Sequence, residues 1–205
     1  MRWWDERVVP RLTDLSLRGH EVGEWRADIC AGLTGRVVEL GFGSGLNARW
    51  YPEAVTEVHA VEPSDRGWEL SARRRARSTV RIERTGLDGQ RLTEADDSAD
   101  HVLTTFTLCT IPDVSSALRE VRRVLKPGGS VRFVEHGLSP DDDVRRWQHR
   151  LDGLQQRVAG GCHLTRDMPA LLSDAGFEIT VERQGYLDGP TLGRAWTWLT
   201  AGRAY

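Results

Sequence analysis

The sequence predicts an α/β fold: a mostly parallel sheet of seven strands, one of them antiparallel, with helices on both faces. A strand-like apolar run, residues 36–40, leads directly into three alternating glycines, Gly41, Gly43 and Gly45. A second apolar run ends in a carboxylate, Glu62. Runs of strand length then alternate with segments of helical periodicity. This is the order of elements that parallel strands require, because each needs a crossover connection to the next.

Length and composition limit the class of protein. At 205 residues the chain fits one domain, and its net charge of −2 gives no general attraction to nucleic acid or anionic membranes. No apolar stretch approaches the roughly 18 residues of a membrane-spanning helix, and the first residues lack the apolar run of a signal peptide. Cys30, Cys109 and Cys162 are far apart, without paired Cys/His spacing. We therefore expect a cytoplasmic protein with free thiols, no metal site and no stable membrane insertion.

The N-terminal segment has the spacing of an amphipathic helix. Over residues 3–17, apolar side chains recur at helical intervals among charges, beginning with Trp3 and Trp4. We expect this helix to dock on the domain. The alternative is a helix lying on a membrane surface, which the mixed charges of its polar face disfavour.

Two helices are expected beside the first strands. Residues 45–51 should form a short helix after the glycines, ending before Pro52 because proline breaks helices. Residues 58–62 form the second strand, and Ser64 after it is a candidate N-cap for a helix that reaches about Arg77.

The middle of the chain supplies three further strands. Residues 80–83 alternate as a half-buried strand does, and residues 100–106 form the fourth strand. Asp113 can cap a helix with apolar side chains at helical spacing, which ends at the glycines before the fifth strand, 130–135. His136 follows this strand directly, on the edge of the sheet where ligands bind in open α/β folds.

The last third of the chain predicts two helices and two strands. Residues 141–158 form a helix that opens with three aspartates, and a shorter one begins at Thr165 and ends at Gly176. Residues 177–183 and 194–201 should form the last two strands, antiparallel to one another at one edge of the sheet. The apolar stripe of the longer helix consists of Val144, Trp147, Leu151, Leu154 and Val158.

The glycine loop has the spacing of a ligand-binding loop. Dinucleotide-binding loops read G-x-G-x-x-G, but here the third glycine comes one residue early, at Gly45, and Leu46 fills the dinucleotide position. Glu39 precedes the first glycine and suits a ligand with an ammonium group better than a pyrophosphate. Glu62, at the end of the next strand, can accept hydrogen bonds from both hydroxyls of a ribose.

Residues 39–45 resemble motif I of the class I S-adenosylmethionine (SAM)-dependent methyltransferases, and residues 121–129 resemble the segment before the fifth strand in their small-molecule branch. Residues 108–113, 134–136 and 161–166 resemble the alkyl-thiol S-methyltransferases and their bacterial relatives. The resemblance implies the Rossmann-like class I methyltransferase fold, SAM as cofactor and S-adenosylhomocysteine (SAH) as product.

The resemblance also implies the organisation of the chain. We expect a single methyltransferase domain over residues 1–205. Its parts would be an N-terminal helical cap (1–30), a SAM-binding core (36–135), a helical insert near the acceptor site (140–175) and C-terminal strands (177–203). The cofactor-binding residues implied are Glu39, Gly41, Phe42, Gly43, Gly45, Leu46, Asn47, Glu62, Pro63, Ser64, Gly86, Leu87, Asp88, Thr105, Phe106 and Thr107.

The acceptor is expected to be a small molecule, with a thiol favoured by the resemblance. If the acceptor carries a proton, His136 is the first candidate for a base and His163 the second, since imidazole titrates near neutral pH. The histidines at positions 20, 59, 101 and 149 are expected to be structural. Residues 105–108 lack the N/D-P-P-Y/F motif of the adenine-N6 and cytosine-N4 enzymes, so nucleic acid is disfavoured.

Three alternatives remain open at this stage. The acceptor could be a quinone, a phenol or another natural product. The chain could also be a nicotinamide-dependent oxidoreductase, or a non-catalytic SAM-binding protein. A monomer and a homodimer are both compatible with the sequence.

Overall fold

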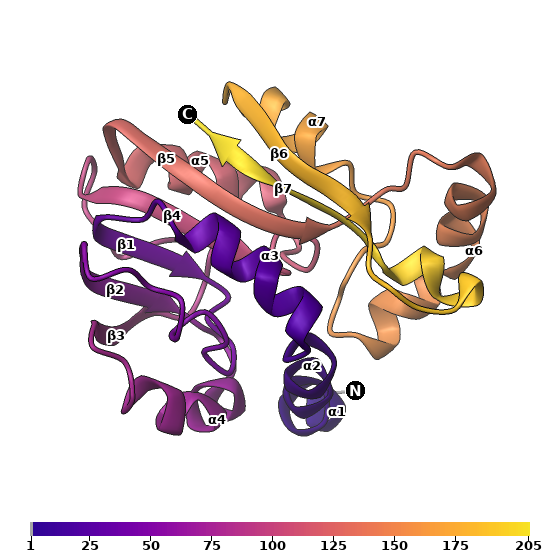
Figure 1. Cartoon of the computed structure of the whole chain (residues 1–205), viewed down its shortest axis with the longest axis horizontal. Coiled ribbons are helices and arrows are strands. Elements are labelled where there is room, and N and C mark those ends of the chain that lie inside the picture. The colour runs from indigo at the N-terminus through magenta and orange to yellow at the C-terminus, as the bar shows by residue number, and fades with distance from the viewer. Residues whose placement is uncertain (1) are drawn as a thin grey trace.

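The chain folds around a seven-stranded sheet in the order β3-β2-β1-β4-β5-β7-β6 (Figure 1). The computed structural model describes residues 2–205. Strands from β3 to β5 are parallel to their neighbours, whereas β7 runs antiparallel to both β5 and β6, so the predicted fold class is confirmed. The strands are β1 (Gly35–Leu40), β2 (Val55–Val61), β3 (Arg81–Gly86), β4 (Ala99–Thr105), β5 (Leu125–His136), β6 (Ile179–Tyr186) and β7 (Trp198–Ala204).

Helices precede the sheet, connect its strands and cover both of its faces (Figure 1). None of the helices within residues 2–205 is long and apolar enough to cross a membrane. They are α1 (Arg2–Arg7), α2 (Val9–Leu17), α3 (His20–Cys30), α4 (Asp65–Arg75), α5 (Val114–Val124), α6 (Asp142–Val158), α7 (Met168–Asp174) and the short 3-10 helix η1 (Thr191–Trp196).

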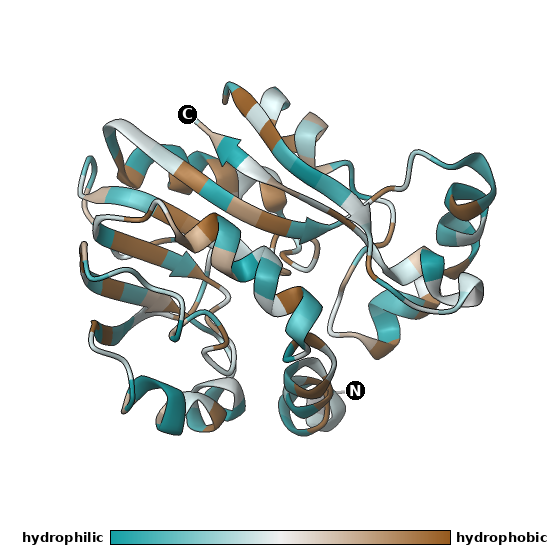
Figure 2. Cartoon of the chain, in the orientation of Figure 1, coloured by the Kyte–Doolittle hydropathy of each residue, from teal (hydrophilic) through white to brown (hydrophobic). Residues whose placement is uncertain are grey.

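The sheet is buried on both faces because its strands alternate apolar side chains between two clusters. Val37 belongs to the cluster that contains Trp25 and Ile29 of α3, whereas its neighbour Val38 belongs to the cluster that contains Leu118 of α5. Figure 2 shows the hydrophobic segments along the strands and the mostly hydrophilic α4 at the periphery. The layered arrangement therefore follows from the period of two in the strand sequences.

Two helices begin where their capping residues predict. The Ser64 hydroxyl accepts a hydrogen bond from Gly67 N at 3.0 Å, and α4 follows. Asp113 accepts one from Ser116 N at 2.9 Å and caps α5 in the same way. Each cap satisfies a backbone N–H that the first helical turn leaves without a partner.

The expected short helix over residues 45–51 is wrong. The segment consists of consecutive turns, with hydrogen bonds from Ala48 N to Gly45 O at 3.2 Å and from Trp50 N to Asn47 O at 2.8 Å. The Asn47 side chain forms hydrogen bonds with Arg26, Glu39 and Thr105 inside the domain. These bonds fix the conformation of residues 45–51 in place of a helix.

The predicted N-terminal helix is interrupted at Val8, because Pro10 occupies the first turn of a second helix. None of the residues of α2 is buried, and Leu12 and Leu15 are each more than half exposed, whereas Val8, Val9 and Leu17 are half-buried. The segment docks on the domain, but only part of its apolar face is covered, and polar contacts also hold it. Asp14 pairs with Arg74 of α4 at 2.7 Å, and Trp4 Nε1 donates to the carbonyl of Val158, the last residue of α6, at 2.9 Å.

Helix α6 docks through an amide rather than through its predicted apolar stripe. Trp147, Leu154 and Val158 are about half exposed, whereas Gln148 is fully buried. The Gln148 side chain accepts a hydrogen bond from Ser139 N at 2.9 Å and donates to the carbonyls of residues 137 and 195 at 3.0 and 3.1 Å. Between α6 and η1 lies a pocket of about 850 Å³, and none of the predicted site residues lines it.

The C-terminal elements begin later than predicted. Residues 194–196 belong to η1, so the last strand starts at Trp198. Helix α7 starts at Met168 rather than at Thr165, and Asp167 caps it by accepting a hydrogen bond from Ala170 N at 3.1 Å.

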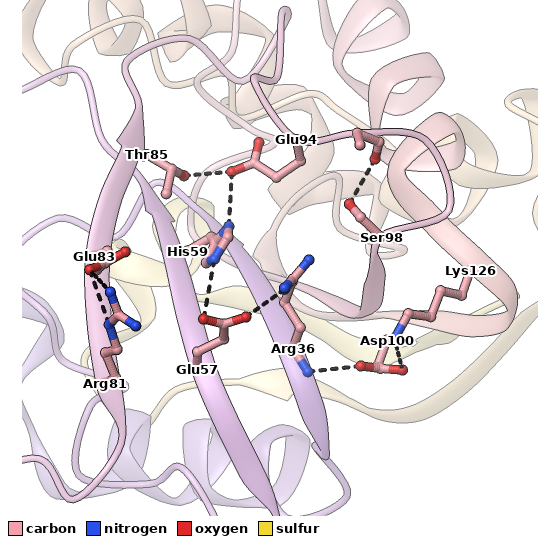
Figure 3. Close-up of polar contacts among 11 residues, drawn as sticks. Arg36, Glu57, His59, Arg81, Glu83, Thr85, Glu94, Ser98, Asp100 and Lys126 are labelled. Carbon is pink, nitrogen blue, oxygen red and sulfur yellow. Dashed lines mark hydrogen bonds and ion pairs between the residues drawn. The ribbon is translucent and has the colours of Figure 1, made fainter.

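A network of charged side chains joins the strands away from their carboxyl ends (Figure 3). His59 Nδ1 lies 3.5 Å from Glu94 Oε1 and its Nε2 lies 3.7 Å from Glu57 Oε2. Arg36 donates to Glu57 at 2.6 Å. His59 thus links β2 to the segment before β4, which is the structural role predicted for it.

Candidate active site

The three glycines of the loop after β1 all have positive φ angles, 67°, 56° and 74° in order. A side chain on Gly41 would overlap Thr107, and one on Gly45 would press against the ring of Phe42. At Gly43 the position of a side chain meets nothing closer than 3.8 Å. Gly43 is therefore where another molecule can approach the bare backbone.

This contrast predicts different results for two alanine substitutions. Gly41→Ala should lower the free energy of unfolding by about 1–3 kcal/mol, because its methyl group overlaps a β-branched side chain that cannot turn away. Gly43→Ala should keep the fold but lower the affinity for SAH by about tenfold or more. Urea unfolding and calorimetric titration of both variants provide the check. Unchanged SAH binding by Gly43→Ala would contradict this location of the cofactor.

Glu62 lies beside Gly43, as predicted. Its Oε2 accepts a hydrogen bond from Gly43 N at 2.5 Å, and its Oε1 accepts one from Ser64 N at 2.7 Å. Burial raises the pKa of the Glu62 carboxyl, in opposition to these two hydrogen bonds. Each oxygen keeps a lone pair for a further donor, so the carboxylate can accept the hydroxyls of a ribose placed over Gly43.

Glu39 makes its contacts inside the protein. It is 1% exposed, and its oxygens accept hydrogen bonds from Asn47 Nδ2 at 3.0 Å and from the hydroxyl of Tyr51. Burial raises the pKa of Glu39 to about 7, against the lowering effect of these bonds. The contact of Glu39 with a ligand ammonium stays a prediction. In the structure, Glu39 holds Asn47 in place through a hydrogen bond.

Arg26 of α3 is a site residue that was not predicted. It is 4% exposed, and its Nη1 donates to Asn47 Oδ1 at 2.7 Å and to Thr105 Oγ1 at 2.8 Å. Its Nε has no hydrogen-bond partner among the described residues. Because Arg26 also lines a pocket smaller than that between α6 and η1, its positive charge can attract a carboxylate ligand there. In the sequence, the only indication of this role is that a charged residue, Arg26, lies between the apolar residues Trp25 and Ile29.

The remaining predicted cofactor residues fall into two groups around this centre. Phe106 has a positive φ of 56°, a conformation that costs a non-glycine residue energy and clusters at functional sites. The Asp88 carboxylate accepts hydrogen bonds from its own turn, at Gln90, and Leu87 is 61% exposed. The first group, at the end of β4, is Thr105, Phe106 and Thr107, and the second, beside β2 and β3, is Pro63, Ser64, Gly86, Leu87 and Asp88.

Two residues of the glycine loop differ in what their side chains can do. The ring of Phe42 is 3% exposed and packs against Trp68 with ring centres 5.5 Å apart, so only its backbone is available to a ligand. Leu46 is half-buried and lines a smaller pocket together with Arg26 and Trp50.

Glu135 anchors the loop after β4, and this role was also not predicted. The carboxylate is fully buried and accepts hydrogen bonds from Thr104 Oγ1 at 2.8 Å and from the backbone N–H groups of Thr107, Leu108 and Cys109 at 3.0–3.3 Å. Burial raises the pKa of Glu135, although these bonds oppose the shift. In the sequence, the only indication of this role is that an acidic residue, Glu135, lies near the end of an otherwise apolar strand.

The structure brings His136 and two cysteines together. His136 is 5% exposed, and its Nδ1 lies 3.8 Å from Cys162 Sγ. Cys162 Sγ lies 3.6 Å from Cys109 Sγ. All three cysteines are free thiols, as expected, but Cys109 and Cys162, far apart along the chain, are close in space. His163 N donates to the Cys109 carbonyl at 2.9 Å and joins the two loops. The spacing of the cysteines along the chain therefore does not argue against a metal site.

The two predicted bases have different surroundings. His136 Nε2 is buried and has no hydrogen-bond partner among residues 2–205. His163 Nδ1 lies 3.5 Å from Asp152 Oδ2 of α6, so its ring is directed to that helix. The two rings thus differ in that His136 is buried at the end of β5, whereas His163 is partly exposed and paired through Nδ1 with Asp152.

Comparisons with known proteins agree with this arrangement. Residues 38–133 match the family model described as a methyltransferase domain. A human thiol S-methyltransferase is 35% identical over 162 residues, which cover 75% of this chain and 65% of that protein. A demethylmenaquinone methyltransferase of Clavibacter sepedonicus is 32% identical over 54% of this chain and 45% of its own.

The solved structures agree in fold. A structure described as a SAM-dependent methyltransferase, possible histamine N-methyltransferase, from Thermotoga maritima superposes with a TM-score of 0.69 at 24% identity, covering 100% of this chain and 99% of that one. The present chain spans less than two thirds of the length of the thiol S-methyltransferases that it matches. It carries a class I methyltransferase domain, and within that family its sequence resembles the thiol S-methyltransferases.

Proposed function

We propose that the protein transfers a methyl group from SAM to a small-molecule thiol. The observation that carries the cofactor assignment is the open backbone at Gly43 beside the Glu62 carboxylate. The Arg26 guanidinium, bonded to Asn47 of the same loop, is the second charged group. These groups match the ribose and the carboxylate of SAM. When bound, SAM supplies the methyl group together with its own leaving group.

The residues of the site have separate tasks in this proposal. Glu62 holds the ribose, and Arg26, fixed by Asn47 and Thr105, holds the carboxylate. The loop after β4, fixed by Glu135, places the acceptor against the methyl group and excludes water. Alignment of this kind can supply about 7–11 kcal/mol of a reaction barrier.

A thiol is the acceptor that the relatives support. Four of them, 32–35% identical to this chain, are named thiol S-methyltransferases. A free thiol ionises near pH 8.5, so an enzyme working near neutral pH must help it to lose a proton. We assign this help to His136, with His163 as the second candidate.

A quinone or phenol is the second candidate acceptor, because demethylmenaquinone methyltransferases are among the relatives. We also propose that the protein acts in the cytoplasm, as a monomer or homodimer, without nucleic-acid partners. The N-terminal cap would cover the acceptor side of the site, since α1 and α2 reach from α4 to the end of α6 (Figure 1).

Binding and turnover test the function in two stages. SAH should bind more tightly than any nicotinamide nucleotide in calorimetric titrations, because the glycine spacing differs from that of dinucleotide sites. The SAM-loaded protein is then assayed with a panel of alkyl and aryl thiols and with a demethylated quinone. A higher affinity for NAD would refute the cofactor assignment. Activity with the quinone and none with any thiol would refute the acceptor alone.

A further inference from the structure

We propose that Cys109, His136 and Cys162 form a binding site for one thiophilic divalent cation, for which Zn²⁺ is the probe. The three residues come from three separate segments: the loop after β4, the end of β5 and the connection between α6 and α7. Their ligand atoms all lie within 4.8 Å of one another. Two sulfurs and one imidazole nitrogen are a ligand set typical of zinc.

The spacing of the ligand atoms fits a tetrahedral ion. With Zn–S bonds of about 2.3 Å and Zn–N bonds of about 2.0–2.1 Å, tetrahedral angles place two sulfurs about 3.8 Å apart and a sulfur and a nitrogen about 3.6 Å apart. The Cys109 and Cys162 sulfurs are 3.6 Å apart, and Cys162 Sγ is 3.8 Å from His136 Nδ1. These two pairs are therefore within a few tenths of an ångström of the tetrahedral separations, and Cys109 Sγ and the His136 nitrogen lie within 4.8 Å of one another.

The imidazole offers one nitrogen, Nδ1, whose only contact is a weak one to sulfur. His136 is 5% exposed, its Nε2 has no partner among the described residues, and its Nδ1 has only the 3.8 Å contact with sulfur. Buried polar groups almost always have good hydrogen bonds, because an unsatisfied one costs about 1–3 kcal/mol. An ion bound through Nδ1 would replace that weak contact with a coordinate bond.

The backbone holds all three ligands in place. Cys109 N donates to Glu135 at 3.3 Å, and its carbonyl accepts from His163 N at 2.9 Å. Arg166, four residues after Cys162, donates to the carbonyl of Leu108. His136 is paired with Leu199 of β7. A site whose supports are fixed in this way does not need to be assembled by the ion.

The number of ligands indicates what the ion could do. Structural zinc sites generally have four protein ligands, whereas three leave the fourth position to water or substrate. The group lies at the carboxyl ends of β4 and β5, on the same edge of the sheet as the glycine loop. The group therefore lies at the edge of the sheet where an acceptor would bind.

A role in thiol activation rests on the proposed function, whereas binding of the ion does not. A hydroxide at the fourth position would take the proton of the acceptor thiol and leave as water, and the thiolate would take its place on the ion. In the metal-loaded protein His136 then acts as a ligand. In the metal-free protein its imidazole takes the proton instead.

The test is metal binding by the reduced, folded protein. After treatment with a chelator, Zn²⁺ should bind with one ion per chain in a calorimetric titration, and Co²⁺ should give a thiolate-to-cobalt charge-transfer band and the visible bands of a tetrahedral site. Cys109→Ser, Cys162→Ser and His136→Ala should each weaken Zn²⁺ binding by about 100-fold or more, because each removes one of three ligands. Cys30→Ser is the matched control, since Cys30 is buried in α3 outside the group.

SAH titration and thermal unfolding of each variant show whether its fold is intact. Wild-type protein that binds SAH but takes up no Zn²⁺ or Co²⁺ would overturn the proposal. So would Zn²⁺ binding with unchanged affinity in both Cys109→Ser and Cys162→Ser, because the ion would then lie elsewhere. If Zn²⁺ binds as expected but no acceptor is methylated, the proposed function fails while the metal site stands.

Discussion

His136→Ala is expected to lose about 10²–10⁴-fold of the activity towards a thiol at pH 7, the range for removal of a group that assists proton transfer. At that pH only a few per cent of a free thiol is ionised. The imidazole is the buried group at the end of β5 with an uncommitted nitrogen. Initial rates at saturating SAM, measured from pH 6 to pH 10, provide the check.

The pH profile separates a chemical role from a structural one. As the pH rises through the ionisation of the acceptor, the variant should recover part of its activity, because the thiol then loses its proton without help. His163→Ala is the comparison variant, because His163 is the second candidate base, and a smaller loss than in His136→Ala would assign the proton transfer to His136. SAH affinity should stay the same in both variants. In the metal-free protein, a His136→Ala enzyme as fast as wild type at pH 7 would leave alignment as the only catalytic device of the site.

The succession of strands along the chain, the caps and the glycine loop could be predicted because they depend on local sequence. Alternation of apolar residues indicates strands, and Ser64 and Asp113 cap helices through bonds to residues three positions away. The turns after Gly45 could not be predicted in the same way. Bonds of Asn47 to Arg26, Glu39 and Thr105 decide that conformation, and these partners come from three other elements.

Long-range contacts also explain why the most specific parts of the site were missed. Cys109, His136 and Cys162 look isolated along the chain and meet only because hydrogen bonds join the loops around 109 and 163. The predicted buried face of α6 is wrong for a related reason. Helical periodicity selects Trp147 as the buried residue, but the unpaired backbone groups near η1 require the amide of Gln148, one position further along.

Glu62→Ala is expected to weaken SAM and SAH binding by roughly 1.5–3 kcal/mol, the range for hydrogen bonds to a charged group. The carboxylate lies beside the open position at Gly43. The substitution also leaves the N–H groups of Gly43 and Ser64 without their acceptor, so Glu62→Gln serves as a second variant that keeps the shape of the side chain. Calorimetric titration with SAH measures the effect directly. Glu57→Ala, at the other end of β2, is the matched control and should bind SAH as wild type does.

The pH dependence of binding gives an independent test of the same carboxylate. Burial raises the pKa of Glu62 above its ordinary value of 4.5, so the group takes up a proton at a higher pH than a free glutamate does. A protonated carboxyl cannot accept both ribose hydroxyls at full strength. Wild-type affinity for SAH should therefore be highest near neutral pH and fall as the pH is lowered through this raised pKa. The fall should be absent in Glu62→Ala and present in Glu57→Ala. Equal affinities of wild type and Glu62→Ala across this pH range would mean that the ribose lies elsewhere and that Glu62 serves only to fix the glycine loop.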